Sequence, residues 1–309
     1  MLCEGDLYSG LSYAESWEEK LSMKKILKRP YRSLVDFSKV YNFMIENYTI
    51  DCRNGCGPAF FEYAQVLHWT DKTQNHRFSI WEEDGIIVAF CWYENKIGEA
   101  YFNIKPGYEE LIPDMISHAE ERLSKEDGTL ELIIYKSQSE VIEEVKKSNY
   151  RKVEEQTEGV YDFSKGPLEY TLPEGFKFEE QGNYDIGKMI DASWRGFDNE
   201  GEPDGGIERG YHLNAAPHAT PELDVIIKTL DDEYVCYAGM WWVPEIRLAY
   251  LEPLCTVPEY RKKGLAAAAL SELYRRMKVL GATHMTGGTN KFYFAIGYEP
   301  TITKSVWEK

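Results

Sequence analysis

The sequence predicts an α/β fold, in the mixed α+β sense, that is built twice in tandem. The chain has 309 residues, which is close to the length of two ordinary domains of about 150 residues each. The order of expected elements in the first half recurs in the second, which indicates an internal repeat. Each half also contains an expected hairpin, so we expect each sheet to be mixed, mostly antiparallel and flanked by helices.

The first half alternates β-branched and aromatic runs with helical patterns. Val40, Phe43 and Met44 recur at helical spacing after Ser33 or Asp36, either of which could cap that helix. Glu83-Asp84-Gly85 is a turn between two apolar runs, which is typical of a hairpin. The expected strands are 24–30, 77–81, 86–93, 100–105, 129–135 and 150–163, and the expected helices are 33–48, 61–69, 113–123 and 139–147.

The second half repeats this order after a join near Ser164-Lys165-Gly166-Pro167. We expect strands at 176–180, 224–230, 234–243, 248–257 and 284–286, with 301–307 closing the sheet, and helices at 185–197, 206–214, 265–280 and 290–296. The domain prediction is therefore an appended segment at 1–22, a first domain at 23–165 and a second domain at 166–309.

The stretch from Leu248 to Leu280 reads as strand, basic glycine turn and helix. Pro258 ends the strand because it has no N–H to donate, and Gly281 is a good helix stop. The first N–H groups of a helix lack internal partners and carry the positive end of its dipole. Gly264 allows a close backbone approach there, so the turn would suit a phosphate or pyrophosphate.

The turn lacks the GxxxxGK[ST] spacing of a nucleoside triphosphate loop and the three glycines of a dinucleotide fingerprint. It resembles instead the pyrophosphate motif of the GNAT acetyltransferase superfamily, R/Q-x-x-G-x-G/A, at Arg261, Gly264 and Ala266. A second match follows at the expected distance. Residues 290–300, NKFYFAIGYEP, resemble the N…FYxxxGF ending of that family, with Tyr298 in place of Phe.

The resemblance implies two tandem GNAT-like domains and acetyl-CoA as co-substrate. It places the pantetheine arm beside the strand that carries Leu254, Cys255 and Thr256, where a backbone N–H would polarise the acetyl oxygen. The expected cofactor-binding residues are Leu254, Cys255, Thr256, Arg261, Lys262, Lys263, Gly264, Leu265, Ala266 and Asn290.

The same resemblance implies direct transfer of acetyl from thioester to amine. Tyr293 matches the family's tyrosine, a general acid for the departing thiolate, although it could be a packing residue. Glu252 is a candidate base, acting directly or through water, or simply a carboxylate on a solvated strand face. A covalent Cys255 intermediate is an alternative that the family mechanism does not require.

The first half lacks the pyrophosphate motif. Its corresponding turn is 104–110, IKPGYEE, whose two glutamates would face any pyrophosphate, and its ending lacks the Phe-Tyr pair. We expect a degenerate copy that supports the second half or shapes its substrate groove. The alternative is a second cofactor site.

Composition restricts the partners. The formal net charge of −17 argues against nucleic acid, and no run approaches the roughly 18 apolar residues of a membrane span. We expect a cytoplasmic protein, because the start lacks the pattern of a signal peptide, and reduced thiols rather than disulfides. A metal site from Cys52, Cys56, His68 and His76 is conceivable, but their spacing is poor and no metal is expected.

These observations predict an acetyl-CoA-dependent N-acetyltransferase that acts on a primary amine of a small molecule, as a monomer or homodimer. The acidic loop 198–206 would suit a cationic acceptor, or is only a solvated loop. Two other classes stay open: a non-catalytic module that binds acyl-CoA as a sensor or scaffold, and a tandem transferase using aminoacyl-tRNA. The net charge and the lack of a basic patch argue against the last.

Overall fold

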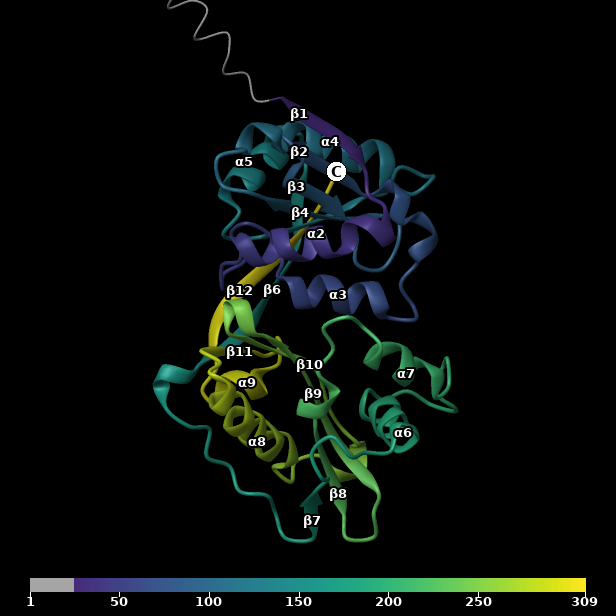
Figure 1. The fold of residues 1–309 in the computed structure, drawn as a ribbon, viewed down its shortest axis with the longest axis vertical. Coiled ribbons are helices and arrows are strands. Elements are labelled where there is room, and N and C mark those ends of the chain that lie inside the picture. The colour runs from purple at the N-terminus through teal and green to yellow at the C-terminus, as the bar shows by residue number, and fades with distance from the viewer. Residues whose placement is uncertain (1–24) are drawn as a thin grey trace, which may run out of the picture.

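The computed structural model describes residues 25–309, which form one continuous sheet of twelve strands with helices packed on it (Figure 1). The expected appended segment 1–22 lies outside these residues. The strands of the first half are β1 Ile26–Pro30, β2 Ser79–Glu83, β3 Ile86–Trp92, β4 Glu99–Ile104, β5 Glu131–Tyr135 and β6 Arg151–Asp162. Its helices are α2 Ser33–Glu46, α3 Pro58–Val66, α4 Ile112–Arg122 and α5 Ser139–Lys147.

The second half follows the same plan. Its strands are β7 Phe176–Phe178, β8 Val225–Thr229, β9 Tyr234–Val243, β10 Leu248–Thr256, β11 His284–Thr286 and β12 Glu299–Glu308. Its helices are α6 Ile186–Gly196, α7 Glu208–Asn214, α8 Leu265–Leu280 and α9 Lys291–Ala295. The expected α/β class and the mostly antiparallel sheet are confirmed, since among the described strands only the β4–β5 and β10–β11 pairs are parallel.

Most boundaries agree with the sequence expectation to within two residues. Helix α3 is an exception at both ends, since it runs Pro58–Val66 rather than 61–69. Proline suits the first helical position, where its missing N–H costs nothing. Helix α2 also differs at its start. Ser33 makes no cap bond, and Asp36 instead accepts a hydrogen bond from the Arg32 backbone N–H at 2.8 Å.

The last strand of each half crosses to the other half. The sheet order is β1-β2-β3-β4-β5-β12-β6-β11-β10-β9-β8-β7. Strand β12 lies between β5 and β6, with Ser305 opposite Ile134 on one side and Glu155 on the other. Strand β6 in turn pairs with β11, where Tyr161 lies opposite Met285. The expectation that 301–307 closes the sheet of its own half is therefore wrong, because alternation along a strand does not specify its partner.

This exchange joins the two halves through two long strands, as the yellow and teal ribbons at the centre of Figure 1 show. Strand β6 has 12 residues and β12 has 10, and they pair along almost their whole length. The expected domain division at residue 165 comes shortly after the end of β6 in the chain, and it stays a prediction. Backbone pairing across the halves fixes the cleft between them.

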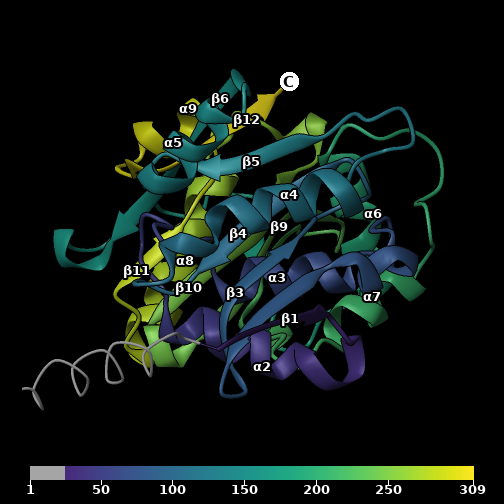
Figure 2. The same cartoon turned by 90° about the horizontal axis from the view of Figure 1, so that it is seen from above.

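Helices cover both faces of the first-half sheet. Figure 2 shows α4 and α2 on opposite sides of β3. On one face the Trp81 indole N–H donates to Asp114 of α4 at 2.7 Å. On the other, Arg29 bridges Glu82 at 2.6 Å and Asp36 of α2 at 2.7 Å. The core between these layers is rich in aromatic residues, including the fully buried Phe61, Phe90 and Trp92.

Helix α3 lies along the junction between the halves (Figure 1). Its Ala59 belongs to a small apolar cluster with Ala216, Trp241, Val243 and Leu248 of the second half. The Tyr48 hydroxyl lies 2.7 Å from His284 Nε2 on β11 and adds a polar contact across the same junction. Elements of the first half therefore form one wall of the cleft beside β10.

Candidate functional site

The turn before α8 has the geometry of an anion site. Lys262 and Gly264 have left-handed backbone conformations, with φ of 61° and 86°. Gly264 is the N-cap of α8, and no side chain among residues 25–309 caps that end. The first N–H groups of this 16-residue helix are therefore open to an external acceptor. A phosphate or pyrophosphate is the natural ligand of such an end.

Arg261 is engaged with the protein itself. Its Nε donates to the Thr256 carbonyl at 3.0 Å and its Nη2 to the Gly196 carbonyl at 2.8 Å. Its Nη1 pairs with Asp198 at 2.9 Å. The guanidinium thus ties the turn to the end of β10 and the end of α6. This geometry gives Arg261 a positioning role for the cradle in addition to the predicted contact with a ligand.

One cleft of about 760 Å³ contains most of the predicted cofactor residues together with Tyr293. The predicted residues that line it are Leu254, Cys255, Thr256, Arg261, Lys262, Gly264, Leu265, Ala266 and Asn290. Lys263 is not among the lining residues, and its ammonium lies over the Tyr260 ring, 4.9 Å from the centroid. The sequence prediction missed Gly196, Asp198, Tyr260, Ala267 and Phe292, which also line the cleft. Gly196 and Asp198 carry no motif and reach the site only through the folding of α6 against β10.

Tyr293 lies on α9 at one wall of this cleft. Asn290 caps that helix, its Oδ1 accepting from the Phe292 N–H at 3.0 Å, which holds the Phe-Tyr pair in place. The Tyr293 ring packs on Gly287 and Gly288, where an added Cβ at Gly288 would lie 2.9 Å from the ring. Burial, and then the charge of Glu252, raise the pKa of Tyr293 well above the usual value near 10. The phenol therefore stays protonated at neutral pH, as a general acid must.

Strands β10 and β11 separate at Glu252. They pair only at Leu248–His284 and Ala249–Met285, after which the Leu251 N–H donates to the Thr286 hydroxyl at 2.9 Å. The register of β10 against β9 also shifts between Leu251 and Leu254, where Pro253 has no N–H for the ladder. The gap lies beside Leu254, where the family resemblance places the pantetheine arm. The oxyanion contact there stays a prediction.

Glu252 does not line the cofactor cleft but lies next to it. It is partly buried, and burial raises its pKa to about 7. A carboxyl group with this pKa is suited to accept a proton near neutral pH. It lines two neighbouring cavities of about 400 and 430 Å³, both of which the first half helps to build.

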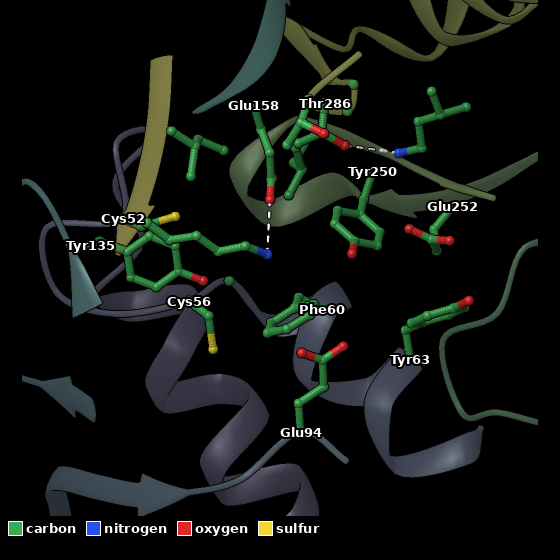
Figure 3. Close-up of a pocket in the computed structure, with 18 of the residues that line it drawn as sticks. Cys52, Cys56, Phe60, Tyr63, Glu94, Tyr135, Glu158, Tyr250, Glu252 and Thr286 are labelled. Atoms are coloured by element: carbon green, nitrogen blue, oxygen red, sulfur yellow. Dashed lines mark hydrogen bonds and ion pairs between the residues drawn. The ribbon is translucent and has the colours of Figure 1, made fainter. Parts of the chain in front are cut away.

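The first of these cavities lies between the halves and is shown in Figure 3. Tyr63 of α3 and Glu252 of β10 lie on the same side of it. Two further carboxylates line its walls: Glu94, which accepts from the Tyr101 hydroxyl at 2.9 Å, and Glu158, which pairs with Lys304 at 3.0 Å. Sequence reasoning missed these residues. They come from both halves and meet only through the strand exchange, so no local pattern could have identified them.

The acidic loop 198–206 is tied to its surroundings at two points. Asp198 pairs with Arg261 at 2.9 Å, and Asp204 lies 3.5 Å from His68 Nε2. Both carboxylates therefore have partners in the protein, which weakens the expectation that this loop binds a cation. Trp194, Phe197, Asn199 and Asp204 of this region line the second cavity.

The turn of the first half differs from that of the second. Its Gly107 N–H donates within the turn itself, to Glu109 Oε1 at 2.9 Å. A carboxylate of the protein therefore lies where the corresponding turn of the second half is open to an anion. This contact supports the prediction that the first half is a degenerate copy.

The described cysteines are buried and unpaired. They are Cys52, Cys56, Cys91, Cys236 and Cys255. Burial raises the pKa of Cys255, so its thiol is poorly suited to nucleophilic attack. Within residues 25–309, no cluster of three or more His, Cys, Asp or Glu side chains is placed to hold a metal ion. Over the same residues, no helix combines the length and apolar character that crossing a membrane requires.

Comparison with known proteins agrees with this geometry. Residues 188–293 match the model of the Acetyltransferase (GNAT) family, a range that contains Glu252, the α8 turn and Tyr293. No curated protein matches the chain. Among solved structures, the fold is similar to a GCN5-related N-acetyltransferase from Sphaerobacter thermophilus, with 16% identity, a TM-score of 0.59 and coverage of 93% of this chain and 96% of that one.

Two further structures show a similar likeness over most of the chain. A tandem GNAT protein from the clavulanic acid biosynthesis pathway has 9% identity and a TM-score of 0.60, covering 92% of this chain and 98% of that one. A GNAT-family acetyltransferase from Colwellia psychrerythraea has 12% identity and a TM-score of 0.58, covering 91% and 98%. At these identities the structures show the shared tandem fold. The family match itself covers residues 188–293, the range that holds Glu252, the α8 turn and Tyr293.

Proposed function

We propose that this protein is an acetyl-CoA-dependent N-acetyltransferase that moves an acetyl group directly from the thioester to a primary amine of a small molecule. One observation carries the proposal. A single cleft joins the uncapped N-terminus of α8 to Tyr293, and Glu252 lies directly beyond it at the junction of the halves. The cleft has an anion cradle at one end and the candidate acid at the other, and the candidate base lines the cavities next to it.

The residues of the cradle fit coenzyme A. Gly264 leaves room at the α8 end, since the nearest atom to an added Cβ is Pro173 Cγ at 4.0 Å. The open N–H groups of α8 and the Lys262 side chain would hold the pyrophosphate. The gap between β10 and β11 would hold the pantetheine arm beside Leu254.

Glu252 and Tyr293 divide the proton transfers between them. Glu252, directly or through one water, takes a proton from the acceptor's ammonium group and leaves a neutral nucleophilic amine. The amine nitrogen forms the new bond to the acetyl carbon as the carbon–sulfur bond breaks. Tyr293 gives its phenolic proton to the departing thiolate and is reprotonated by the proton that the amide nitrogen releases.

The test is to incubate the full chain with acetyl-CoA and a panel of primary amines, following thiol release and the acetylated amine by mass spectrometry. Turnover with an acetylated product supports the proposal. Tight acetyl-CoA binding with no amine-dependent thioester loss would favour the non-catalytic acyl-CoA module. Hydrolysis without an acetylated amine would contradict transfer to nitrogen.

A further inference from the structure

We propose that the acceptor is an amino acid, an amine that also carries a carboxylate, and that Arg209 binds this carboxylate. This inference rests on the proposed function, because it names the substrate class of the same site. It is carried by the second cavity that Glu252 lines, which has a volume of about 430 Å³. A cavity of this volume suits a small ligand.

Both halves of the chain build this cavity. Tyr63 and Trp69 come from the first half, and Trp194, Arg209 and Glu252 come from the second. Glu252 is shared with the cavity between the halves, so an amine held at this carboxylate would have the second cavity beside it. The cavity therefore adjoins the reacting groups.

Arg209 is held in place, but its hydrogen-bonding capacity is not filled by the described residues. Its guanidinium lies over two indole rings, 5.8 Å from the Trp69 ring centroid and 5.7 Å from that of Trp194. The Trp194 indole N–H is itself fixed by the carbonyls of Glu200 and Gly201, at 3.2 and 3.1 Å. The Arg209 Nη1 is buried and has no hydrogen-bond partner among residues 25–309.

An unsatisfied buried guanidinium N–H is costly, because its desolvation is not repaid by a hydrogen bond. A planar carboxylate compensates it well, since the guanidinium fork matches two carboxylate oxygens. Cation–π contacts with two indoles hold the side chain in place before binding, so less side-chain entropy remains to be lost. An anion bound here would complete a site that the protein leaves incomplete.

The local charges favour a carboxylate over a phosphate. Arg209 is the one Arg or Lys among the described residues that line this cavity. Burial, and to a lesser extent the Arg209 charge, lower the pKa of His68, so the His68 imidazole stays neutral at pH 7. Asp204 and Glu252 contribute negative charge to the same walls. Since these walls already carry negative charge, a single guanidinium can compensate the one charge of a carboxylate ligand better than the two charges of a phosphate.

Tyr63 lies near both groups that would bind the ligand, Glu252 and Arg209. Burial and the Glu252 carboxylate raise the pKa of Tyr63, and the Arg209 charge opposes this increase. Its phenol is therefore within electrostatic reach of both groups. An amino acid would place its ammonium at Glu252, where it is deprotonated, and its carboxylate at Arg209.

The alternative role of Arg209 is structural, as a cation–π contact that holds Trp69 of the first half to Trp194 of the second. The test compares amino acids with their own carboxamides, which keep size and remove the charge, over amine–carboxylate spacings from α to ω. Acetyl transfer is measured for the wild-type chain, Arg209→Met, Arg209→Lys and the control Arg275→Met. Arg275 is an exposed partner of Glu272 on α8, outside both cavities.

For at least one pair, we expect the wild type to favour the acid by about 10–100-fold in kcat/KM, the usual worth of a charged hydrogen-bonded pair. The acid-to-amide ratio of kcat/KM should fall to about one in Arg209→Met. It should be intermediate between that value and the wild-type value in Arg209→Lys, and it should stay at the wild-type value in Arg275→Met. An acid preference that survives in Arg209→Met would overturn the assignment, as would a wild type without any preference.

Calorimetry separates this inference from the proposed function. The same acid and amide pairs are titrated into the chain in the presence of coenzyme A. Arg209-dependent binding of the acid without acetyl transfer would refute the proposed function and leave the amino acid site standing. Acetyl transfer to amines with equal affinity for acid and amide would refute the site and leave the function standing.

Discussion

The buried Glu62 carboxylate of α3 holds His218 of the second half by two contacts. Glu62 Oε1 accepts from the His218 backbone N–H at 2.7 Å, and Glu62 Oε2 lies 2.6 Å from His218 Nδ1. The His218 ring also stacks on Tyr41, with centroids 4.0 Å apart. The pair fastens the two halves beside the cleft that they form.

We expect Glu62→Ala to lower the free energy of unfolding by about 2–4 kcal/mol, because it removes a fully buried carboxylate that accepts both His218 contacts. His218→Ala alone should cost less, since its side chain is partly exposed. A double-mutant cycle in denaturant should give a coupling energy of about 1–3 kcal/mol. Additive effects of the two changes would show that the contact does not join the halves.

Glu252→Gln tests the base. The wild-type kcat/KM should rise with pH through about 7, the pKa to which burial raises this carboxyl, because the base must be ionised. The amide of the variant cannot titrate, so the pH profile of Glu252→Gln should lose the rise through about pH 7. Its rate should also fall by about 10²–10⁴-fold. A variant that keeps most of its rate would assign the proton to water.

Glu252→Gln should lower activity but raise the stability of the folded protein at alkaline pH. The folded-state pKa of Glu252 is about 7, above the unfolded value near 4.3, so the folded protein binds this proton more tightly. Stability is therefore lost as the pH rises from about 4 to 7. Glu252→Gln should be more stable than the wild type by about 1–3 kcal/mol at pH 8 and similar to it near pH 4. Equal stability at both pH values would contradict the raised pKa.

Tyr293→Phe tests the acid. The change keeps the ring that packs on Gly287 and Gly288 and removes the one proton. Turnover should fall by about 10²–10⁴ with little change in acetyl-CoA affinity, because the hydroxyl acts mainly in the transition state. Since the pKa of Tyr293 lies well above its usual value, the wild type should show no alkaline limb near pH 10. Full turnover in the variant would make Tyr293 a packing residue.

Local sequence patterns predicted the parts of the site that are local in the chain. The strand, turn and helix around Gly264 follow from proline, glycine and helical spacing, whereas the cap that Asn290 makes on α9 was not predicted. The cleft also contains Arg261, but its three bonds to Thr256, Gly196 and Asp198 depend on α6 packing against β10. A motif match could not distinguish this positioning role from direct contact with a ligand.

The acceptor side could not be predicted from the sequence. Tyr63, Glu94 and Glu158 belong to three different segments of the first half and meet Glu252 because β6 and β12 exchange partners. Strand alternation indicates which face is buried but not which strand is the neighbour. The strand expected at 301–307 is present as part of β12, but its place between β5 and β6 does not follow from the sequence pattern.

The most direct test of the account is calorimetric titration of acetyl-CoA into the wild type, Gly264→Glu and Gly281→Glu. Both glycines have left-handed backbones, with φ of 86° and 90°, at the two ends of α8, so the two variants carry similar strain. Only the Gly264→Glu variant places a carboxylate in the anion cradle. We predict one site per chain in the wild type, unchanged affinity in Gly281→Glu and no measurable binding in Gly264→Glu. Two equivalent sites per chain, or full binding in Gly264→Glu, would contradict the assignment.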